Sequence, residues 1–112
     1  MSRMLATNYD DCKQLLDNAR KDYKFIGNNT YIKYDENMDI VVHYHNSDIV
    51  LLLKNGDVLI TLAGWPTTTT KQRVNQFIGN RKVYTKNYIT YLDGMRMDKY
   101  EWYLVTKEDI YA

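Results

Sequence analysis

The sequence predicts an α+β domain in which two helices accompany a single curved antiparallel sheet, built as a meander followed by a C-terminal hairpin. Two segments carry apolar residues at helical spacing, whereas the residues between and after them alternate with a period of two. An Asn-Gly pair between two apolar runs is the strongest short-range signal of a β-hairpin. The 112 residues match the size of one domain, spanning 1–112.

The first helix is predicted over Asn8–Arg20 because its apolar residues form one stripe. Cys12, Leu15, Leu16 and Ala19 recur at i, i+3, i+4 and i+7. Two aspartates in the first turn suit the positive end of the helix dipole. The stripe predicts a packing role for the Cys12 thiol and not that of a nucleophile.

The meander is predicted to begin at Tyr23. Alternation over Thr30–Tyr34 and Asp39–His45 predicts half-buried strands, and the apolar run Ile49–Leu53 predicts a strand covered on both faces. A tight primed turn at Asn55-Gly56 is then expected to join Ile49–Lys54 to Asp57–Ala63.

The second helix is predicted over Thr69–Ile78, with Val74, Phe77 and Ile78 on one face and Gly79 as its stop. The remaining strands, Val83–Tyr91 and Tyr100–Thr106 with a turn at Asp93-Gly94, are predicted to form the C-terminal hairpin. The tail from Lys107 to Ala112 is ambiguous.

Composition restricts the function. The net charge of +1 gives no global attraction to nucleic acid or membrane, so an anion site must be local. A single cysteine suits a reducing compartment, and no apolar run reaches the roughly 20 residues of a membrane helix. With no signal-peptide pattern, we expect a soluble, cytoplasmic protein. Eleven tyrosines predict a partner surface and a homo-oligomer, at least a dimer.

The segment Gly64–Phe77 predicts a phosphate or nucleotide pocket. Four consecutive threonines precede a helix start, where free N–H groups and the dipole favour an anion. The alternative is plain capping, because Thr69 and Gln72 fit a capping box and Trp65 fits a core. Capping, however, accounts for only one of the four threonines.

Arg73 is the sharpest candidate within this segment. It lies about 100° from Val74 around the helix, so it is predicted to flank the core without entering it. One turn from Thr69, its guanidinium could hold a phosphate bidentately. The alternative is a surface salt bridge.

The other constellations argue for binding and not for catalysis. His43 and His45 are predicted on one strand face as a candidate metal pair, but a third ligand is missing and a half-buried polar face explains them better. No nucleophile elbow, glycine-rich phosphate loop or zinc spacing is present. We therefore expect a protein that is not an enzyme and has no cofactor and no metal.

Basic and aromatic residues continue beyond Gly79, where arginine and lysine could meet phosphates while rings stack bases. An ordinary sheet edge with alternating Lys and Tyr is the alternative. The candidate ligand-binding residues are Trp65, Thr67, Thr69, Thr70, Lys71, Arg73, Asn75, Phe77, Asn87 and Arg96.

Four motifs resemble a family of small proteins encoded by bacteriophages and prophages. They are Asn28-Asn29-Thr30-Tyr31, Val42-x-Tyr44-His45-x-Ser47-Asp48-Ile49-Val50, Asn55-Gly56 and Gly64-Trp65-x-Thr67-x-Thr69-Thr70-Lys71-x-Arg73-Val74-Asn75. The resemblance implies that the protein acts in the cytoplasm of an infected bacterium.

Length and layout also resemble the Thoeris anti-defence family. That resemblance implies a homo-oligomeric sponge that traps a cyclic ADP-ribose-type signal or a cyclic oligonucleotide without cleaving it. It implies a role only, and no family residue is carried over. Two alternatives are a protein-interaction module that inhibits a host enzyme or defence complex, and a small nucleic-acid-binding accessory protein using Arg73, Arg81, Lys82 and Lys86. The near-neutral charge counts against nucleic acid.

Overall fold

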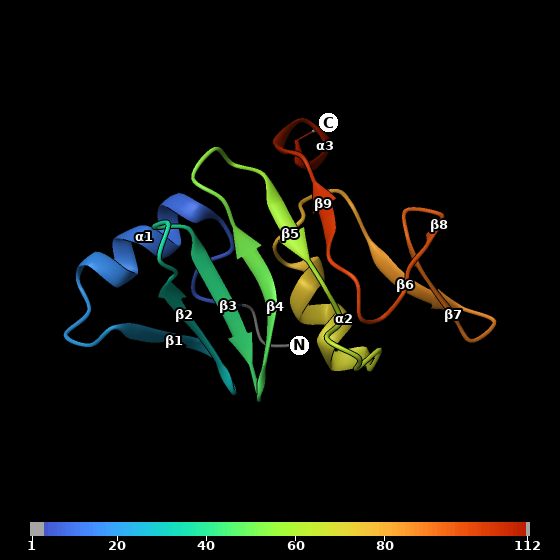
Figure 1. Cartoon of the computed structure of the whole chain (residues 1–112), viewed down its shortest axis with the longest axis horizontal. Helices are drawn as coiled ribbons and strands as arrows, with labels where there is room; N and C mark the ends of the chain where they lie inside the picture. Colours follow the sequence, from blue (N-terminus) through green and yellow to red (C-terminus); the bar gives the residue numbers. More distant parts are fainter. Residues whose placement is uncertain (1–3, 112) are drawn as a thin grey trace.

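The computed structural model describes residues 4–111 and confirms the α+β class, but it divides the strands between two antiparallel sheets (Figure 1). The larger sheet has six strands in the order β1-β2-β3-β4-β5-β9. These are β1 (Tyr23–Gly27), β2 (Thr30–Tyr34), β3 (Ile40–Tyr44), β4 (Ser47–Leu52), β5 (Val58–Ile60) and β9 (Tyr103–Val105). The smaller sheet has three, namely β6 (Val83–Lys86), β7 (Ile89–Leu92) and β8 (Met95–Arg96).

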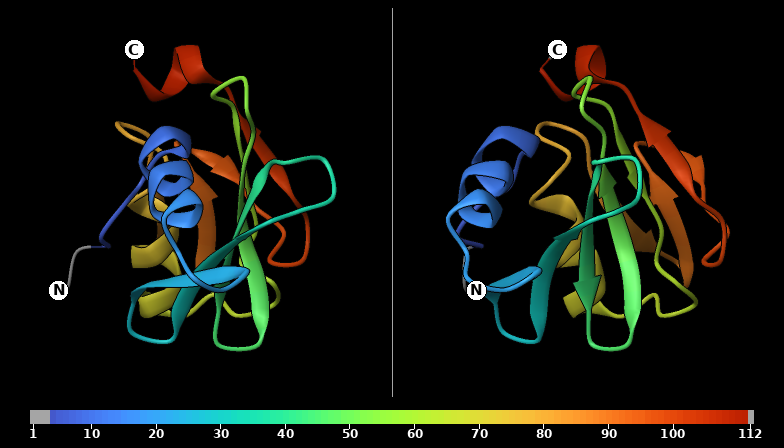
Figure 2. Two further views of the ribbon diagram at one scale, coloured as in Figure 1. Left: turned by 90° about the vertical axis from the view of Figure 1, so that its left-hand side faces the viewer. Right: turned by 60° about the vertical axis from the view of Figure 1, so that its left-hand side comes forward.

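The helices α1 (Tyr9–Asp17) and α2 (Thr68–Asn75) lie on the same side of the six-stranded sheet (Figure 2). A third helix, α3 (Lys107–Ile110), forms in the tail that the sequence left ambiguous. α1 starts one residue later than predicted, because Asn8 is its N-cap, whose side chain accepts a hydrogen bond from Asp11 N. It ends earlier than predicted, at the C-cap residue Asn18. No helix among residues 4–111 is long and apolar enough to cross a membrane.

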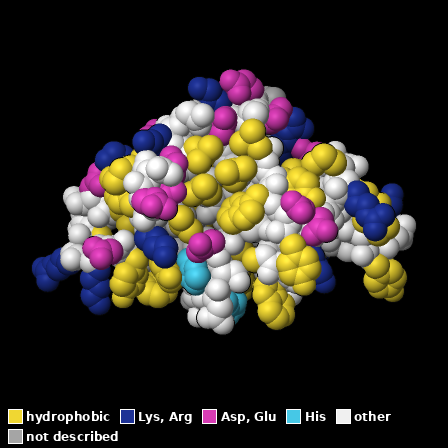
Figure 3. All heavy atoms as spheres, in the orientation of Figure 1, with side chains coloured by type: hydrophobic (Ala, Val, Ile, Leu, Met, Phe, Trp, Pro, Cys, Tyr) yellow, Lys and Arg dark blue, Asp and Glu magenta, His cyan; other side chains and the backbone are white. Residues whose placement is uncertain are grey.

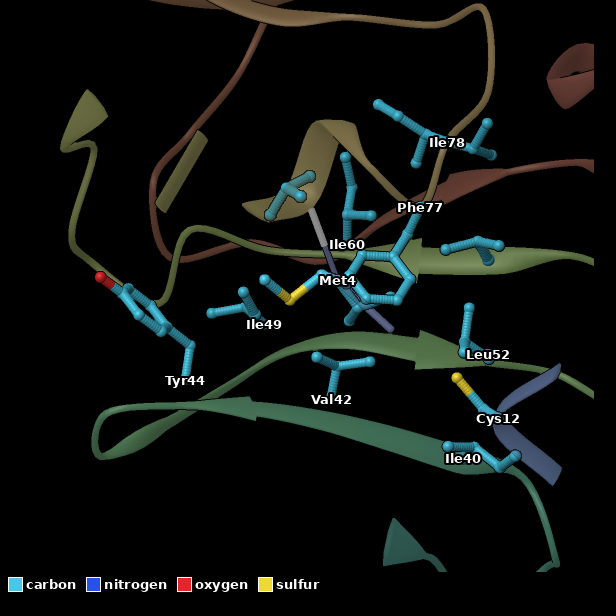
Figure 4. Close-up of a cluster of buried hydrophobic side chains, with 14 of the residues drawn as sticks. Met4, Cys12, Ile40, Val42, Tyr44, Ile49, Leu52, Ile60, Phe77 and Ile78 are labelled. Carbon is cyan, nitrogen blue, oxygen red and sulfur yellow. The ribbon is translucent and has the colours of Figure 1, made fainter. Parts of the chain in front are cut away.

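Within residues 4–111, no helix covers the other face of the six-stranded sheet (Figure 2). Figure 3 shows hydrophobic side chains gathered on that face, over β4, β5 and β9. The core lies on the helix side, where alternate strand residues meet Cys12 and Leu16 of α1 and Val74 of α2. Figure 4 shows Cys12 beside Ile40 and Leu52 at one end of this core.

The predicted C-terminal hairpin is wrong in two respects. The expected strand Val83–Tyr91 turns back on itself at Asn87-Tyr88, so it forms the hairpin β6–β7. Both turn residues have positive φ, 52° and 68°, which a primed hairpin turn requires and asparagine tolerates. The last strand, β9, does not pair with this segment. It pairs with β5, setting Val58 against Val105, a long-range pairing that local sequence patterns do not contain.

The turn at Asn55-Gly56 does join β4 to β5, but it is not the predicted two-residue primed turn. Leu53 N donates to Asp57 O at 3.0 Å and Gly56 N to Leu53 O at 2.9 Å, so the loop has three residues. Gly56 takes the left-handed position with φ of 97°. This is the geometry of a type I turn followed by a glycine bulge, for which glycine is also the preferred residue.

Cys12 provides a test of the core. Its side chain is fully buried, and burial raises the pKa of the thiol to about 12. Since the thiolate is the reactive species, we expect no reaction between the native protein and a disulfide reagent at neutral pH, and one thiol per chain after denaturation. The extent of reaction in the native and in the denatured protein is measured by the absorbance of the aromatic thiolate that the disulfide reagent releases. Rapid labelling of the native protein would contradict the packing of α1.

Candidate functional site

A pocket of about 420 Å³ lies between the β3–β4 turn and the start of α2. Its lining comprises Tyr44, His45, Asn46, Ser47, Ile49, Leu62, Trp65, Thr67, Thr69 and Thr70. Two buried aliphatic residues, Ile49 and Leu62, belong to the core. Figure 4 shows Tyr44 at the opposite end of the core from Cys12, next to Ile49 and with its hydroxyl directed outward. The pocket therefore combines an apolar base with hydroxyl, amide and aromatic groups.

The threonine run begins α2 one residue earlier than predicted. Thr67 is the N-cap, and its Oγ1 accepts a hydrogen bond from Thr70 N at 3.2 Å. The same oxygen lies 2.9 Å from Thr70 Oγ1, and Thr70 is buried. The capping alternative therefore holds for the run but at Thr67, and not as a capping box of Thr69 and Gln72, because the chain is already helical at Thr68. Thr69 remains exposed at the pocket.

The position of Arg73 is the one that differs most from its prediction. Arg73 enters the core side of α2 and is only 6% exposed, so it is neither a flanking residue nor part of a surface salt bridge. The guanidinium carbon lies 5.1 Å from the centre of the Tyr44 ring, and Nη2 donates to the Asn28 carbonyl at 3.1 Å. Arg73 is buried because the turn after β1 and the end of β3 both contact α2 at this residue. Those two contacts leave Arg73 with polar partners inside the fold.

The charge of Arg73 is not balanced by any carboxylate in the part of the chain that the structure describes. None of the ion pairs there includes it, and its buried Nε has no hydrogen-bond partner among these residues. Buried charges are normally paired, since removing an ion from water costs several kcal/mol. Arg73 does not line the pocket. Its guanidinium packs against the ring of Tyr44, which does line the pocket.

Four of the ten predicted ligand-binding residues line this pocket: Trp65, Thr67, Thr69 and Thr70. Trp65 is 63% exposed, and its ring is therefore accessible. The others have different positions. Lys71 Nζ bonds Thr85 Oγ1 at 2.5 Å, and Phe77 is in the core.

The remaining three predicted residues belong to the smaller sheet or hold it in place. The Asn75 amide bonds both backbone groups of Val83, donating to its carbonyl at 2.9 Å and accepting from its N–H at 2.7 Å. Asn87 forms the β6–β7 turn, and Arg96 is exposed on β8. The structure does not bring these three side chains to the pocket.

Sequence reasoning missed the wall formed by Tyr44, His45, Asn46 and Ser47 as a ligand site. These residues close the hairpin between β3 and β4, where Tyr44 pairs with Ser47. A signal was present, because the motif Tyr44-His45-x-Ser47 accompanies the threonine motif in the bacteriophage resemblance. Two motifs separated in sequence that share one pocket cannot be recognised without the fold.

The two histidines do not share a strand face. His43 is on β3, stacked on Tyr31 with ring centres 4.8 Å apart, and its Nδ1 lies 2.7 Å from Asp48 Oδ1. His45 follows the strand in a turn with φ of 54°. The chain reverses there, and this removes the predicted i, i+2 alignment. Residues 4–111 contain no group of three or more His, Cys, Asp or Glu side chains that could hold a metal ion.

Of the basic residues after Gly79, Arg81 is held in ion pairs, whereas Lys82, Lys86 and Arg96 are exposed. Arg81 bridges Asp93 and Asp109, with both N–O distances 2.9 Å. These hydrogen bonds raise the pKa of Arg81, and its bond to Asp109 holds the pKa of that carboxyl below its usual value. Arg81 therefore ties the β7–β8 turn to α3.

A second cavity, of about 490 Å³, lies near the start of α1, the β4–β5 loop and α3. Its charged lining is mainly acidic: Asp10, Asp11 and Asp57 against Lys54. Carboxylates disfavour an anion, so the cavity at α2 is the better candidate for a phosphate-bearing ligand.

One comparison with known proteins identifies a relationship. The family model described as Kyanoviridae Gp96 protein matches residues 10–109. No curated protein and no solved structure gives a significant match.

Proposed function

The chain belongs to the Kyanoviridae Gp96 protein family, a family of bacteriophage proteins, and from this premise we propose that it binds a small nucleotide-derived anion in the pocket at the start of α2. The protein holds this molecule without cleaving it. In an infected cell it would act as a sponge for a signalling nucleotide of the cyclic ADP-ribose or cyclic oligonucleotide type.

The observation that carries the proposal is the uncompensated cation that packs against Tyr44 of the pocket lining. Arg73 is buried and lacks a carboxylate partner among the described residues. For an anion placed about 8 Å from the guanidinium, at an effective dielectric constant of about 20, the Coulomb attraction is about 2 kcal/mol. A ligand phosphate supplies the negative charge that the fold itself does not provide there.

The pocket lining supports the same ligand class. The hydroxyls of Thr67 and Thr70 bond each other, but Thr69 places an exposed hydroxyl at the helix start, where the dipole also favours negative charge. The exposed Trp65 ring offers a face on which a base can stack. A phosphate and a base are the two parts that all nucleotide signals share, so the lining fits the class without selecting one member.

The family match supports the bacteriophage origin alone, and the sponge role is proposed on the pocket chemistry and on the resemblance in length and layout to the Thoeris anti-defence family. Calorimetric titration with cyclic ADP-ribose and a cyclic dinucleotide tests it, with adenosine as the uncharged control. We expect at least one phosphate-bearing probe to bind far more tightly than adenosine. Mass spectrometry after heat denaturation should recover it intact. Recovery of a cleaved product, or equal binding of adenosine, would contradict the proposal.

Trp65→Ala tests the stacking contact. Loss of base–aromatic stacking costs about 1–3 kcal/mol, so we expect binding of the responding nucleotide to weaken roughly 10- to 100-fold with an unchanged melting temperature. Tyr88→Ala is the matched control, because Tyr88 is a fully exposed aromatic residue on the β6–β7 turn and does not line the pocket. Equal affinities of the two variants would remove Trp65 from the site.

A further inference from the structure

The uncovered face of the six-stranded sheet carries an aliphatic row at positions where an antiparallel sheet normally presents polar residues to water. The row consists of Val41, Leu51, Leu59 and Leu104. These residues are direct partners across four adjacent strands, β3, β4, β5 and β9. Along β5 both neighbours of Leu59 are buried, so the row points away from the core. Figure 3 shows the hydrophobic atoms gathered over these strands.

Aromatic residues extend this apolar surface at both sides of the row. On β1 and β2, Tyr23, Phe25 and Tyr31 form a cluster of edge-to-face contacts with ring centres 5.5–5.8 Å apart. Tyr23 pairs with Lys33, which in turn pairs with Val41, so Lys33 lies between the row and this cluster at the sheet edge. At the other side, Trp102 lies two residues before Leu104 and is 44% exposed.

The exposed apolar area is of the size that a stable dimer needs. Phe25 and Leu104 are each more than half exposed, and Tyr23 and Trp102 are about two-fifths exposed. At roughly 200 Å² per large side chain, these four alone present about 400 Å² of surface. A standard interface buries about 800 Å² per partner, of which about 57% is apolar. The four side chains and the half-buried members of the row together supply that apolar fraction.

We propose that this face packs against the same face of a second copy of the chain. The row itself contains no charged residue, the exposed Lys33 lies between it and the aromatic cluster, and the chain carries a net charge of only +1, so the central contact of two copies involves little electrostatic repulsion. A two-fold axis parallel to the strands, between β4 and β5, sets Leu51 of each copy opposite Leu59 of the other. The result is a two-layer sheet sandwich in which helices cover the outside of each layer.

Light scattering on the full chain tests this arrangement. We expect a mass of twice 13.3 kDa for the wild type at micromolar concentration. Leu59→Lys should reduce the mass to that of one chain while the far-ultraviolet circular dichroism stays native. Leu104→Lys at the sheet edge is the second variant, because its side chain is already half in water and the substitution is readily tolerated by the monomer.

Tyr88→Lys is the control, since it places the same charge on the smaller sheet and should leave the dimer intact. A wild-type mass of one chain at the highest soluble concentration overturns the proposal and assigns the face to a different partner. A dimer that persists in both leucine variants overturns it as well, because the interface would then lie elsewhere. Neither readout depends on a ligand, so this test is independent of the proposed function.

Discussion

Arg73→Met is expected to weaken binding of a phosphate-bearing nucleotide by about 30-fold, because the variant loses about 2 kcal/mol of attraction to the ligand anion. The stability should behave differently. Burial of a lone cation costs several kcal/mol, and the contact with Tyr44 and the bond to Asn28 offset only part of that cost. We therefore expect the melting temperature of the methionine variant to stay within a few degrees of wild type or to rise.

Calorimetric titration and thermal denaturation measure the two effects separately. Arg81→Met is the control, since it also removes one arginine but from a partly exposed position bridged to two carboxylates. It should leave ligand affinity unchanged. A fall of more than about 10 °C for Arg73→Met, equivalent to a few kcal/mol, would identify Arg73 as a structural clamp between α2 and the β1–β2 turn. Wild-type affinity in the folded methionine variant would exclude its charge from the binding site.

Asn75→Leu is expected to destabilise the domain by about 2–5 kcal/mol. Its side chain satisfies both the N–H and the carbonyl of Val83, a residue that is 1% exposed. Each buried backbone group left without a partner costs about 1–3 kcal/mol, and leucine can bond neither. For a domain of this size the melting temperature should fall by about 10–20 °C.

Urea denaturation gives the free energy of unfolding for this comparison. Gln72→Leu is the matched control, an exposed amide on the same helix three residues earlier, and should change stability by less than about 0.5 kcal/mol. If Asn75→Leu is as stable as this control, the amide does not attach β6 to α2. Ligand affinity of the folded fraction should remain that of the wild type, since Asn75 does not line the pocket.

The local elements of this protein follow from its sequence. The predicted strand Thr30–Tyr34 has the same bounds in the structure. Alternation with a period of two indicates which residues of a strand face the core. The starts of α1 and α2 were within one residue, since capping side chains act over three residues. The position of the pocket, at the start of α2, was also indicated by the threonine run and Trp65.

The tertiary structure decided which distant segments meet. The pairing of β9 with β5 joins residues more than 40 positions apart, and no local pattern distinguishes it from a C-terminal hairpin. The same holds for the pocket wall at His45 and for the burial of Arg73, which depends on contacts with Asn28 and Tyr44. Propensity and periodicity describe one segment at a time, whereas burial is a property of surfaces brought together. From its position next to Val74 in the helix, Arg73 is expected at the protein surface. In the folded structure the ends of two β-hairpins cover it.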